Sequence, residues 1–337
     1  MAGFEPATSA SQTQHSNQAE LRPAVRRLPV YVRAMVQPRP ALGYVMVAVA
    51  ATLFAVNGTV SKVILGSGIG SGELTEVRCA GAVVGLALIA AVTRPSSLRV
   101  RLGDLPLLVA LGIALALVQW SYFFAIHRLD IGIALLIQYV APILVALWAR
   151  FVFHEPVRRR IWAALAVSLA GLMLIVEIWH GGRLSEAGVA ACIVAAITYA
   201  AYVLIAERGV RRRDPISLSA WGFLFATLFW TLVAPWWNFP GSRVDDDVSL
   251  LGNLASSHLP VWLLMLWMIV LGTIVPFALV VGALRHISAT RAGITAMLEP
   301  VVAIVVAWAW LGESLAPVQL SGAVLTLIGI GLAQTAR

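Results

Sequence analysis

The amino-acid sequence predicts an all-α integral membrane protein with ten transmembrane helices, arranged as two inverted five-helix repeats. The first observation is composition: of 337 residues, 60% are hydrophobic and 12% are charged, and the mean hydropathy of +0.88 is far above that of a soluble globular protein. The second is a series of ten apolar segments, each long enough to cross about 30 Å of hydrocarbon. The third is an internal repeat in which the second copy has the opposite orientation.

The apolar segments follow a polar stretch, residues 1–40, which we expect to be a disordered cytoplasmic segment. It contains no apolar core of signal-peptide length, so a cleaved secretory signal is not expected. The predicted spans cover residues 41–65, 73–93, 104–126, 131–153, 160–178, 186–206, 215–237, 261–284, 290–311 and 316–335.

The positive charges indicate how these spans cross the membrane, because Lys and Arg are enriched in cytoplasmic connectors. With the amino terminus inside, most of the 24 Lys and Arg residues fall in inner segments, and three fall in outer connectors: Arg128, Arg183 and Arg243. We therefore expect a multi-pass protein of the cell membrane with both termini in the cytoplasm. The basic clusters lie between apolar spans rather than along a soluble face, so the net charge of +8 does not indicate nucleic-acid binding.

The internal repeat relates residues 125–174 to residues 283–332, which lie 158 positions further along the chain. Both stretches contain a proline in mid-span, Pro142 and Pro300, then a glutamate where the apolar run stops, and then a second apolar span. This order of unusual residues is not expected by chance in an apolar background. Repeats of this kind are typical of transporters.

Five spans per repeat is an odd number, so the second repeat must enter the membrane in the opposite direction. The corner after Glu155 is strongly basic, whereas the corner after its equivalent, Glu313, contains no cation. The same motif therefore faces opposite sides of the membrane. We place the first repeat at residues 41–178 and the second at 186–335.

Four groups of local motifs stand out: Leu298-Glu299-Pro300-Val301 with Leu311-Gly312-Glu313, Pro142 with Phe153-His154-Glu155, Ala50-Ala51 with Asn57, and Glu76-Val77-Arg78. With these motifs the chain resembles the EamA family of the drug/metabolite transporter superfamily over roughly residues 41–335. It departs from the family at Phe54-Ala55, where members often have Trp-Gly, and at Ala141, so that the Glu-Pro pair occurs in the second half alone. The resemblance implies a ten-helix inverted-repeat carrier, often an exporter of amino acids or other small metabolites.

Glu299 is the most informative single residue, because it lies inside an apolar span and beside a proline. An ionised carboxylate there costs several kcal/mol unless it is paired, solvated or protonated. One hypothesis is a site for proton coupling or for a substrate amine. The structural alternative is that Glu299 bonds to backbone or hydroxyl groups near Pro300, where a backbone donor is missing.

Pro142 and Pro300 each remove one helical hydrogen bond and are predicted to kink helices 4 and 9 near mid-membrane. Such kinks can shape a transport path or serve plain helix packing. Glu155 and Glu313 are predicted at helix C-termini, where a carboxylate opposes the helix dipole and needs a partner. We expect both to be structural corners, with the basic run at residues 158–160 available to the first.

Further polar and amphipathic side chains would line a central cavity by analogy with the family. They offer hydrogen bonds and aromatic faces to a small polar solute, or alternatively they pack between helices or lie at the interface. Lys62 and Arg78 are predicted near the outer ends of helices 1 and 2, where a cation can snorkel or bind solute. The cavity candidates are Asn57, Gln119, Trp120, Gln138, Tyr139, Tyr199 and Tyr202.

The leading hypothesis is a secondary transporter, an exporter of small metabolites such as amino acids, that works by alternating access. The sequence contains no Walker-type phosphate loop, so a gradient is expected to supply the energy, with proton coupling as one option. A non-transporting membrane receptor or scaffold is the alternative. An enzyme is disfavoured, because no metal-spaced His cluster, Ser/His/Asp set or paired in-membrane carboxylates are found. No metal or cofactor is expected; the expected partners are the lipid bilayer and the solute, and a homodimer is one assembly left open.

Overall fold

The computed structural model describes residues 39–126, 128–129, 131–154, 156–177, 179, 185–233 and 239–335. Within this part of the chain, ten helical segments are long and apolar enough to cross a membrane, which confirms the predicted number of spans and the all-α class. The segment predicted to be disordered lies outside the described residues, except for its last two positions.

Seven of the described spans are single α-helices and three are interrupted. The single helices are α3 (Pro40–Gly66), α4 (Ser71–Thr93), α5 (Leu105–Ile126), α8 (Arg159–Val176), α9 (Glu186–Val210), α10 (Pro215–Val233) and α15 (Pro317–Thr335). The interrupted spans are α6 (Ile131–Gln138) with α7 (Ala141–Phe151), α11 (Val261–Ile269) with a π-helical segment (Val270–Ile274) and α12 (Val275–Ala283), and α13 (Ala289–Ala296) with α14 (Leu298–Val306) and a second π-helical segment (Ala307–Leu311).

The longest connector, between α10 and α11, contains a small hairpin that the sequence did not predict. Strand β1 (Asp247–Ser249) pairs antiparallel with β2 (His258–Pro260), with Val248 opposite Leu259. The hairpin is tied to the end of the ninth span, because Trp310 Nε1 donates to the backbone oxygen of Leu250 at 2.7 Å.

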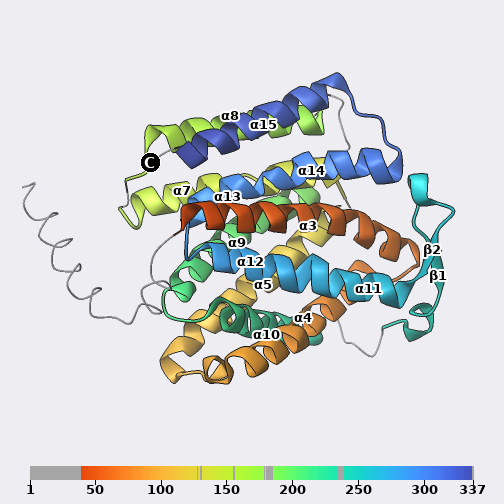
Figure 1. The fold of residues 1–337 in the computed structure, drawn as a ribbon, viewed down its shortest axis with the longest axis horizontal. Helices are drawn as coiled ribbons and strands as arrows, with labels where there is room; N and C mark the ends of the chain where they lie inside the picture. Colours follow the sequence, from red (N-terminus) through yellow and green to blue (C-terminus); the bar gives the residue numbers. More distant parts are fainter. Residues whose placement is uncertain are drawn as a thin grey trace, which may run out of the picture. The chain divides into compact units, whose positions relative to one another are not determined.

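Helices of the two repeats alternate in the packing (Figure 1). Helix α3 of the first repeat packs against α12 and α14 of the second, and its counterpart α9 packs against α5 and α7 of the first. Two other large contacts pair direct counterparts, α4 with α10 and α8 with α15. A third joins α10 to α5, and its counterpart is the smaller contact of α4 with α11 and the π-helical segment that follows it. Each contact therefore has a partner when the repeats are exchanged, as a pseudo-two-fold axis requires. Both repeats belong to one compact unit that starts at Pro40.

The contact between α8 and α15 shows this symmetry residue by residue. Gly171 lies against Thr326, and Gly329 lies against Ser168. The repeat offset of 158 makes Gly171 equivalent to Gly329 and Ser168 equivalent to Thr326, so the two contacts are one contact repeated across the axis. A methyl group on either glycine would collide with the backbone of the facing helix. Small residues are what allow membrane helices to approach this closely.

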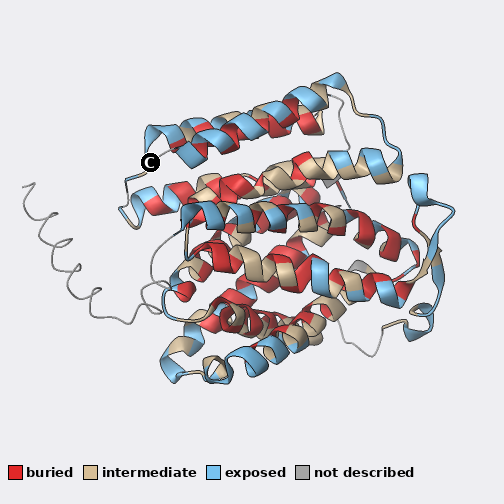
Figure 2. Ribbon diagram, viewed as in Figure 1, coloured by how far each residue is buried: buried red, intermediate tan, exposed pale blue. Residues whose placement is uncertain are grey.

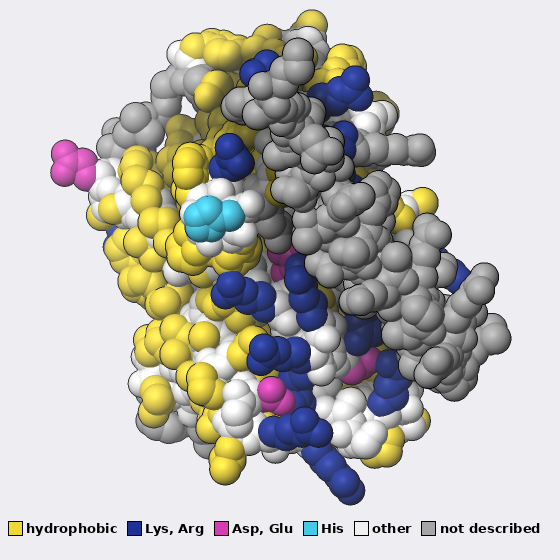
Figure 3. All heavy atoms as spheres, turned by 90° about the vertical axis from the view of Figure 1, so that its left-hand side faces the viewer, with side chains coloured by type: hydrophobic (Ala, Val, Ile, Leu, Met, Phe, Trp, Pro, Cys, Tyr) yellow, Lys and Arg dark blue, Asp and Glu magenta, His cyan; other side chains and the backbone are white. Residues whose placement is uncertain are grey.

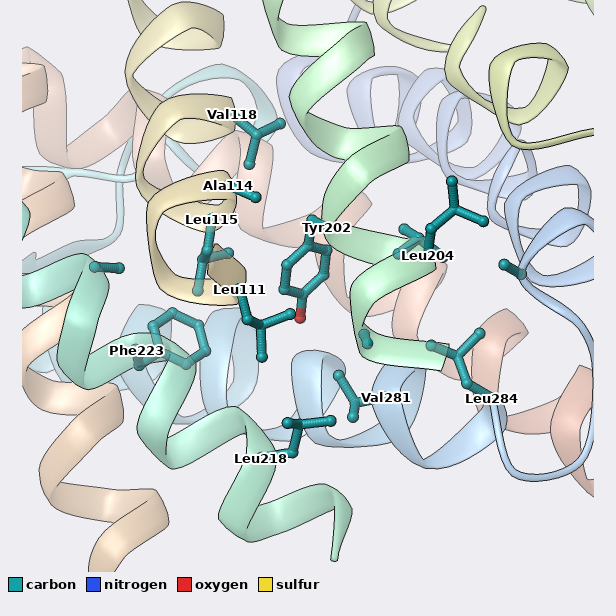
Figure 4. Close-up of a cluster of buried hydrophobic side chains, with 14 of the residues drawn as sticks. Leu111, Ala114, Leu115, Val118, Tyr202, Leu204, Leu218, Phe223, Val281 and Leu284 are labelled. Carbon is teal, nitrogen blue, oxygen red and sulfur yellow. The ribbon is translucent and has the colours of Figure 1, made fainter. Parts of the chain in front are cut away.

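Burial follows the same arrangement, with buried residues on the faces that meet inside the bundle and exposed residues on the outer faces (Figure 2). Outward-facing side chains include large apolar ones, such as Val92 at 77% and Leu232 at 86% exposure. Apolar exposure on this scale is costly in water and is what a hydrocarbon solvent requires. The largest buried cluster joins α5, α9, α10 and α12 through Leu111, Tyr202, Phe223 and Val281 (Figure 4).

Candidate functional site at the two broken helices

The fourth and ninth spans are interrupted at equivalent points. The break lies at residues 139–140 in the fourth span and at Met297 in the ninth, and the repeat offset of 158 takes one onto the other. Pro142 and Pro300 fall in the first turn of the helices that restart there, α7 and α14. Proline is tolerated at such a position because the missing N–H would have no helical partner. At both prolines the helical hydrogen bonding is interrupted, as expected of a proline inside a span, while Val140 and Met297 keep right-handed helical backbone angles.

The two breaks contact each other through Tyr139. Its phenol oxygen lies 2.8 Å from Glu299 Oε2 and 3.1 Å from the backbone oxygen of Ala296. Tyr139 belongs to the first repeat, whereas Ala296 and Glu299 belong to the second, so this contact joins the repeats. The structure thus brings together the candidate carboxylate and one candidate tyrosine at the point where both helices are broken.

This arrangement offers one proton to two acceptors. A phenol has a single O–H, so it can donate fully either to Glu299 or to the Ala296 carbonyl. When Tyr139 donates to Glu299, the carboxylate can be ionised. When it donates to Ala296, Glu299 can keep its short contact with the phenol oxygen as a protonated carboxyl that donates to it. The geometry therefore fits two protonation states of Glu299, each with its own hydrogen-bond pattern.

Arg78 supplies positive charge to the same region. It is close enough to Glu299 for electrostatic attraction, although among the ion pairs of the described residues none joins the two. Its Nε donates to Thr273 Oγ1 at 2.9 Å, and its guanidinium lies 5.9 Å from the centre of the Phe277 ring. These contacts hold Arg78 inside the bundle. The guanidinium therefore contacts two side chains of the second repeat, an arrangement that differs from snorkelling to the membrane surface.

Thr273 is a residue of this site that the sequence did not indicate. It lies in the π-helical segment Val270–Ile274, and its hydroxyl donates to the backbone oxygen of Met268 at 2.9 Å. Pro276 lies two residues after this segment and lacks an N–H for the preceding turn. A wider π turn relieves that constraint, and such turns are frequent at functional sites. Pro276 in the middle of an apolar span was the signal that could have revealed this irregularity.

Two more tyrosines are within electrostatic reach of Glu299. They are Tyr199 of α9, which the sequence suggested, and Tyr122 of α5, which it did not. With Tyr139, phenol groups from three different spans lie in the neighbourhood of the carboxyl, and Tyr139 is the one hydrogen-bonded to it among the described residues. Such groups offer hydrogen bonds without adding fixed charge.

Three candidate amide side chains have buried oxygens without a hydrogen-bond partner in the described residues: Asn57 Oδ1, Gln119 Oε1 and Gln138 Oε1. Asn57 lies against Gly272 of the first π-helical segment, and Gln119 Nε2 approaches Cys79 Sγ at 3.4 Å, next to Arg78 in sequence. A buried acceptor without a donor costs about 1–3 kcal/mol. These oxygens are therefore positions at which water or a bound solute would be stabilising.

Two other candidates have mainly apolar surroundings, although the Tyr202 ring reaches Phe277 with the centroids 6.2 Å apart. Tyr202 is 3% exposed and is enclosed in the hydrophobic cluster between α5, α9 and α10, near Leu111 and Phe223 (Figure 4). Trp120 is 41% exposed, and its ring packs against Phe124 with the centroids 5.5 Å apart. The structure places Tyr202 in the core and Trp120 on the outer surface of the bundle.

The remaining candidates are located at the helix ends. Lys62 lies 4.0 Å from Glu313, and both side chains are more than half exposed. Lys62 is thus the partner of Glu313 that the neighbouring sequence does not provide. Glu155, the equivalent of Glu313, lies outside the described residues. An exposed pair of this kind contributes about 0–1 kcal/mol.

Ten membrane-spanning helices in inverted repeats, with two spans broken where the repeats meet, define the class of multi-pass membrane carriers. The model of the EamA-like transporter family matches residues 41–177 and 186–335. The chain belongs to this family and is a membrane transporter.

Similar proteins with known names are transporters too. The threonine/homoserine exporter RhtA of Escherichia coli strain K12 is 26% identical over 254 residues, which cover 75% of this chain and 78% of that protein. An uncharacterized transporter of Archaeoglobus fulgidus is 26% identical over 213 residues, covering 63% and 70%. A crystal structure shares the fold with a TM-score of 0.68 and 17% sequence identity, over 86% of this chain and 96% of that one.

Proposed function

We propose that this chain is a secondary exporter of small metabolites such as amino acids, working by alternating access with proton exchange at Glu299. The observation that carries the proposal is the contact of Tyr139 with Glu299 and Ala296 at the meeting point of the two broken helices. The similarity to RhtA, which is named as a threonine/homoserine exporter, supports export and amino acids as the solute class. The solute is moved without chemical conversion.

Proton exchange follows from the two hydrogen-bond patterns of Tyr139. A protonated Glu299 leaves the Tyr139 proton for Ala296, and an ionised Glu299 draws that proton to itself. An ionised carboxylate can also bind a cationic group of the solute, which makes proton and solute alternative occupants of one carboxyl. Because Tyr139 belongs to the other repeat, each change of occupant changes a bond between the repeats. This is a direct route from binding to conformational change.

Alternating access also requires one end of the bundle to close. At the end where α4 stops and α10 starts, Arg213 Nη1 lies 3.0 Å from Asp104 Oδ2, and Arg94 Nη1 lies 2.5 Å from Asp214 Oδ1. Arg285 Nη2 lies 3.9 Å from Asp214 Oδ1. These pairs join Arg94 and Asp104 of the first repeat to residues of the second. We propose that they hold this end closed and separate when it opens.

We propose that the same end faces the cytoplasm, with both termini. Basic side chains gather on the face of the bundle where α3 begins, with a few acidic ones among them (Figure 3). Concentrations of Lys and Arg are retained on the cytoplasmic side of membrane proteins. Closure at this end would leave the site accessible from outside, as expected for the stage at which an exporter releases its solute. Both halves of the site come from one chain, so the proposal does not depend on a homodimer.

The experiment that tests the proposal is solute movement in proteoliposomes that contain purified protein and no ATP. Labelled L-threonine inside the vesicles should leave faster when a proton gradient is imposed, with protons entering as the amino acid leaves. Collapse of the gradient should abolish net movement and leave exchange of labelled for unlabelled solute intact. Binding without any flux, across a broad panel of metabolites, would favour the receptor role instead.

A further inference from the structure

We infer that the site recognises both poles of a zwitterionic α-amino acid, with the Arg78 guanidinium binding its carboxylate and the Glu299 carboxylate binding its ammonium group. The inference rests on the transport function proposed above and adds to it which residue of the site recognises each charged group of the solute. It follows from how these two charged side chains are held, and from which of their polar atoms remain without a partner.

The guanidinium of Arg78 is anchored along one edge. Nε donates to Thr273 Oγ1 at 2.9 Å, and the Phe277 ring lies 5.9 Å away. Phe277 is itself fixed by edge-on contacts with Phe54 and Phe223. Nη1 and Nη2 have no hydrogen-bond acceptor among the described residues. These two nitrogens form the part of the guanidinium fork that matches the two oxygens of a carboxylate.

Glu299 is satisfied on one side in the same way. Oε2 receives the Tyr139 contact at 2.8 Å, and Oε1 has no hydrogen-bond donor in the part of the chain that the structure describes. An ammonium group has three donors and one positive charge, and it can use Oε1 without displacing Tyr139. Tyr139 therefore holds the carboxylate in place through Oε2, while Oε1 can accept a hydrogen bond from a cation.

The two charges come from opposite repeats and interact without touching. Arg78 lies on α4 and Glu299 on α14, and each contributes to the electrostatic environment of the other. Their separate anchors, Thr273 and Tyr139, explain why they do not close into an ion pair of the described chain. A solute with both charges can bridge them. A solute with a single charge leaves the other residue half-buried and uncompensated, which is unfavourable.

This arrangement predicts how affinity changes when one charged group is removed from the ligand or one charged residue is removed from the protein. The protein, in lipid nanodiscs, is screened for binding of the proteinogenic amino acids, starting with L-threonine and L-leucine. The tightest ligand is then compared with its amino alcohol, which lacks the carboxylate, and with its 2-hydroxy acid, which lacks the amine. We expect each analogue to bind the unaltered protein about 10- to 100-fold more weakly than the amino acid.

The variants assign each pole. In Arg78→Gln, the amino acid and its amino alcohol should bind with similar affinity, while the preference over the hydroxy acid remains. In Glu299→Gln, the amino acid and its 2-hydroxy acid should bind with similar affinity, while the preference over the amino alcohol remains. The exposed pair outside the site provides matched controls, Lys62→Gln and Glu313→Gln, which should retain both preferences. Arg78→Lys keeps the charge and loses the fork, so it gives an intermediate preference and covers the case in which Arg78→Gln does not fold.

Several results would overturn the inference: no binding by any proteinogenic amino acid, equal binding of both analogues by the unaltered protein, or an equal loss for all three ligands in each variant. Flux measurements separate this failure from failure of the transport proposal. Exchange of another polar solute with no preference for zwitterions leaves transport intact and removes the inference. Two-pole binding of an amino acid with no flux supports the inference and removes transport.

Discussion

Tyr139 in the first repeat and Glu299 in the second are joined by a contact of 2.8 Å at the breaks of two symmetry-related helices. The same phenol lies 3.1 Å from the carbonyl of Ala296, the last residue of α13. The break of one repeat is therefore bonded to the break of the other, and the bond includes the titratable group on which the proposed proton exchange depends. The predictions below test this relationship and the packing that supports it.

Removing the phenol oxygen should impair transport. Tyr139→Phe leaves both Glu299 and the Ala296 carbonyl without their donor, and a hydrogen bond to a charged group is worth about 1.5–3 kcal/mol. We expect exchange of L-threonine to slow by about 10-fold or more, measured in proteoliposomes. Tyr202→Phe is the matched control, because Tyr202 lies in the hydrophobic cluster. The exchange rate of this variant should be close to that of the unaltered protein. Equal rates in the two variants would contradict the role given to Tyr139.

Breaking the ion pairs at the basic end should destabilise the closed state. The side chains of Arg213 and Asp104 are 7% and 24% exposed, so loss of Arg213 would leave Asp104 half-buried and without its partner. Loss of one member of such a pair costs about 2–5 kcal/mol. We expect Arg213→Gln to lower the unfolding temperature and to increase thiol labelling of cysteines placed deeper in the bundle.

The charge reversal of this pair provides the test of direct interaction. Asp104→Arg and Arg213→Asp should each be worse than Arg213→Gln, and the double variant should recover part of the lost stability. Strict additivity of the two single changes would show that the 3.0 Å contact does not contribute.

The close approach of α8 and α15 should be sensitive to a single methyl group. In Gly329→Ala the added carbon meets Ser168 and the backbone of Ala164, so the helices must separate. Overpacking of this kind costs about 1–3 kcal/mol, and we expect a lower unfolding temperature in detergent. Gly331→Ala on the same helix is the control, because nothing lies within 4 Å of its added carbon. The symmetry also predicts that Gly171→Ala behaves like Gly329→Ala.

Orientation can be read from labelling of intact cells. Arg212 and Asp246 are both exposed, so each can be replaced by a single cysteine. The cysteine at 212 should be protected from an impermeant thiol reagent, and the cysteine at 246 should react with it. The reason is that basic clusters stay inside and the acidic connector is translocated. Both native cysteines, Cys79 and Cys192, are buried and free, and are replaced first. Labelling at 212 without labelling at 246 would reverse the topology.

The number and limits of the spans could be predicted because hydrocarbon thickness fixes how many apolar residues a helix needs. The opposite orientation of the two repeats could also be predicted, because the corners after Glu155 and Glu313 differ in charge. Tyr139 and Glu299 could each be selected as polar groups inside spans. That they touch could not be predicted, because a contact between residues 160 positions apart has no counterpart in local periodicity.

Arg78 illustrates the same limit. Its position in the second span was compatible with snorkelling, and Thr273, which holds it inside, lies 195 residues away. Tyr122 gives no distinct signal in the sequence, because a single tyrosine in an apolar span is common at interfaces and in cores. The ion pairs of Arg213 and Asp214 join connectors that are far apart in the sequence, so composition revealed their charge and not their pairing.

The central claim is that Glu299 is the group that exchanges protons for solute, and Glu299→Gln tests it most directly. Gln keeps the shape and most hydrogen bonding of the side chain and cannot titrate. In proteoliposomes at saturating L-threonine, we expect this variant to exchange labelled for unlabelled solute and to show no response to an imposed proton gradient. Gradient-driven export by Glu299→Gln at the rate of the unaltered protein would contradict the claim and remove Glu299 from the mechanism.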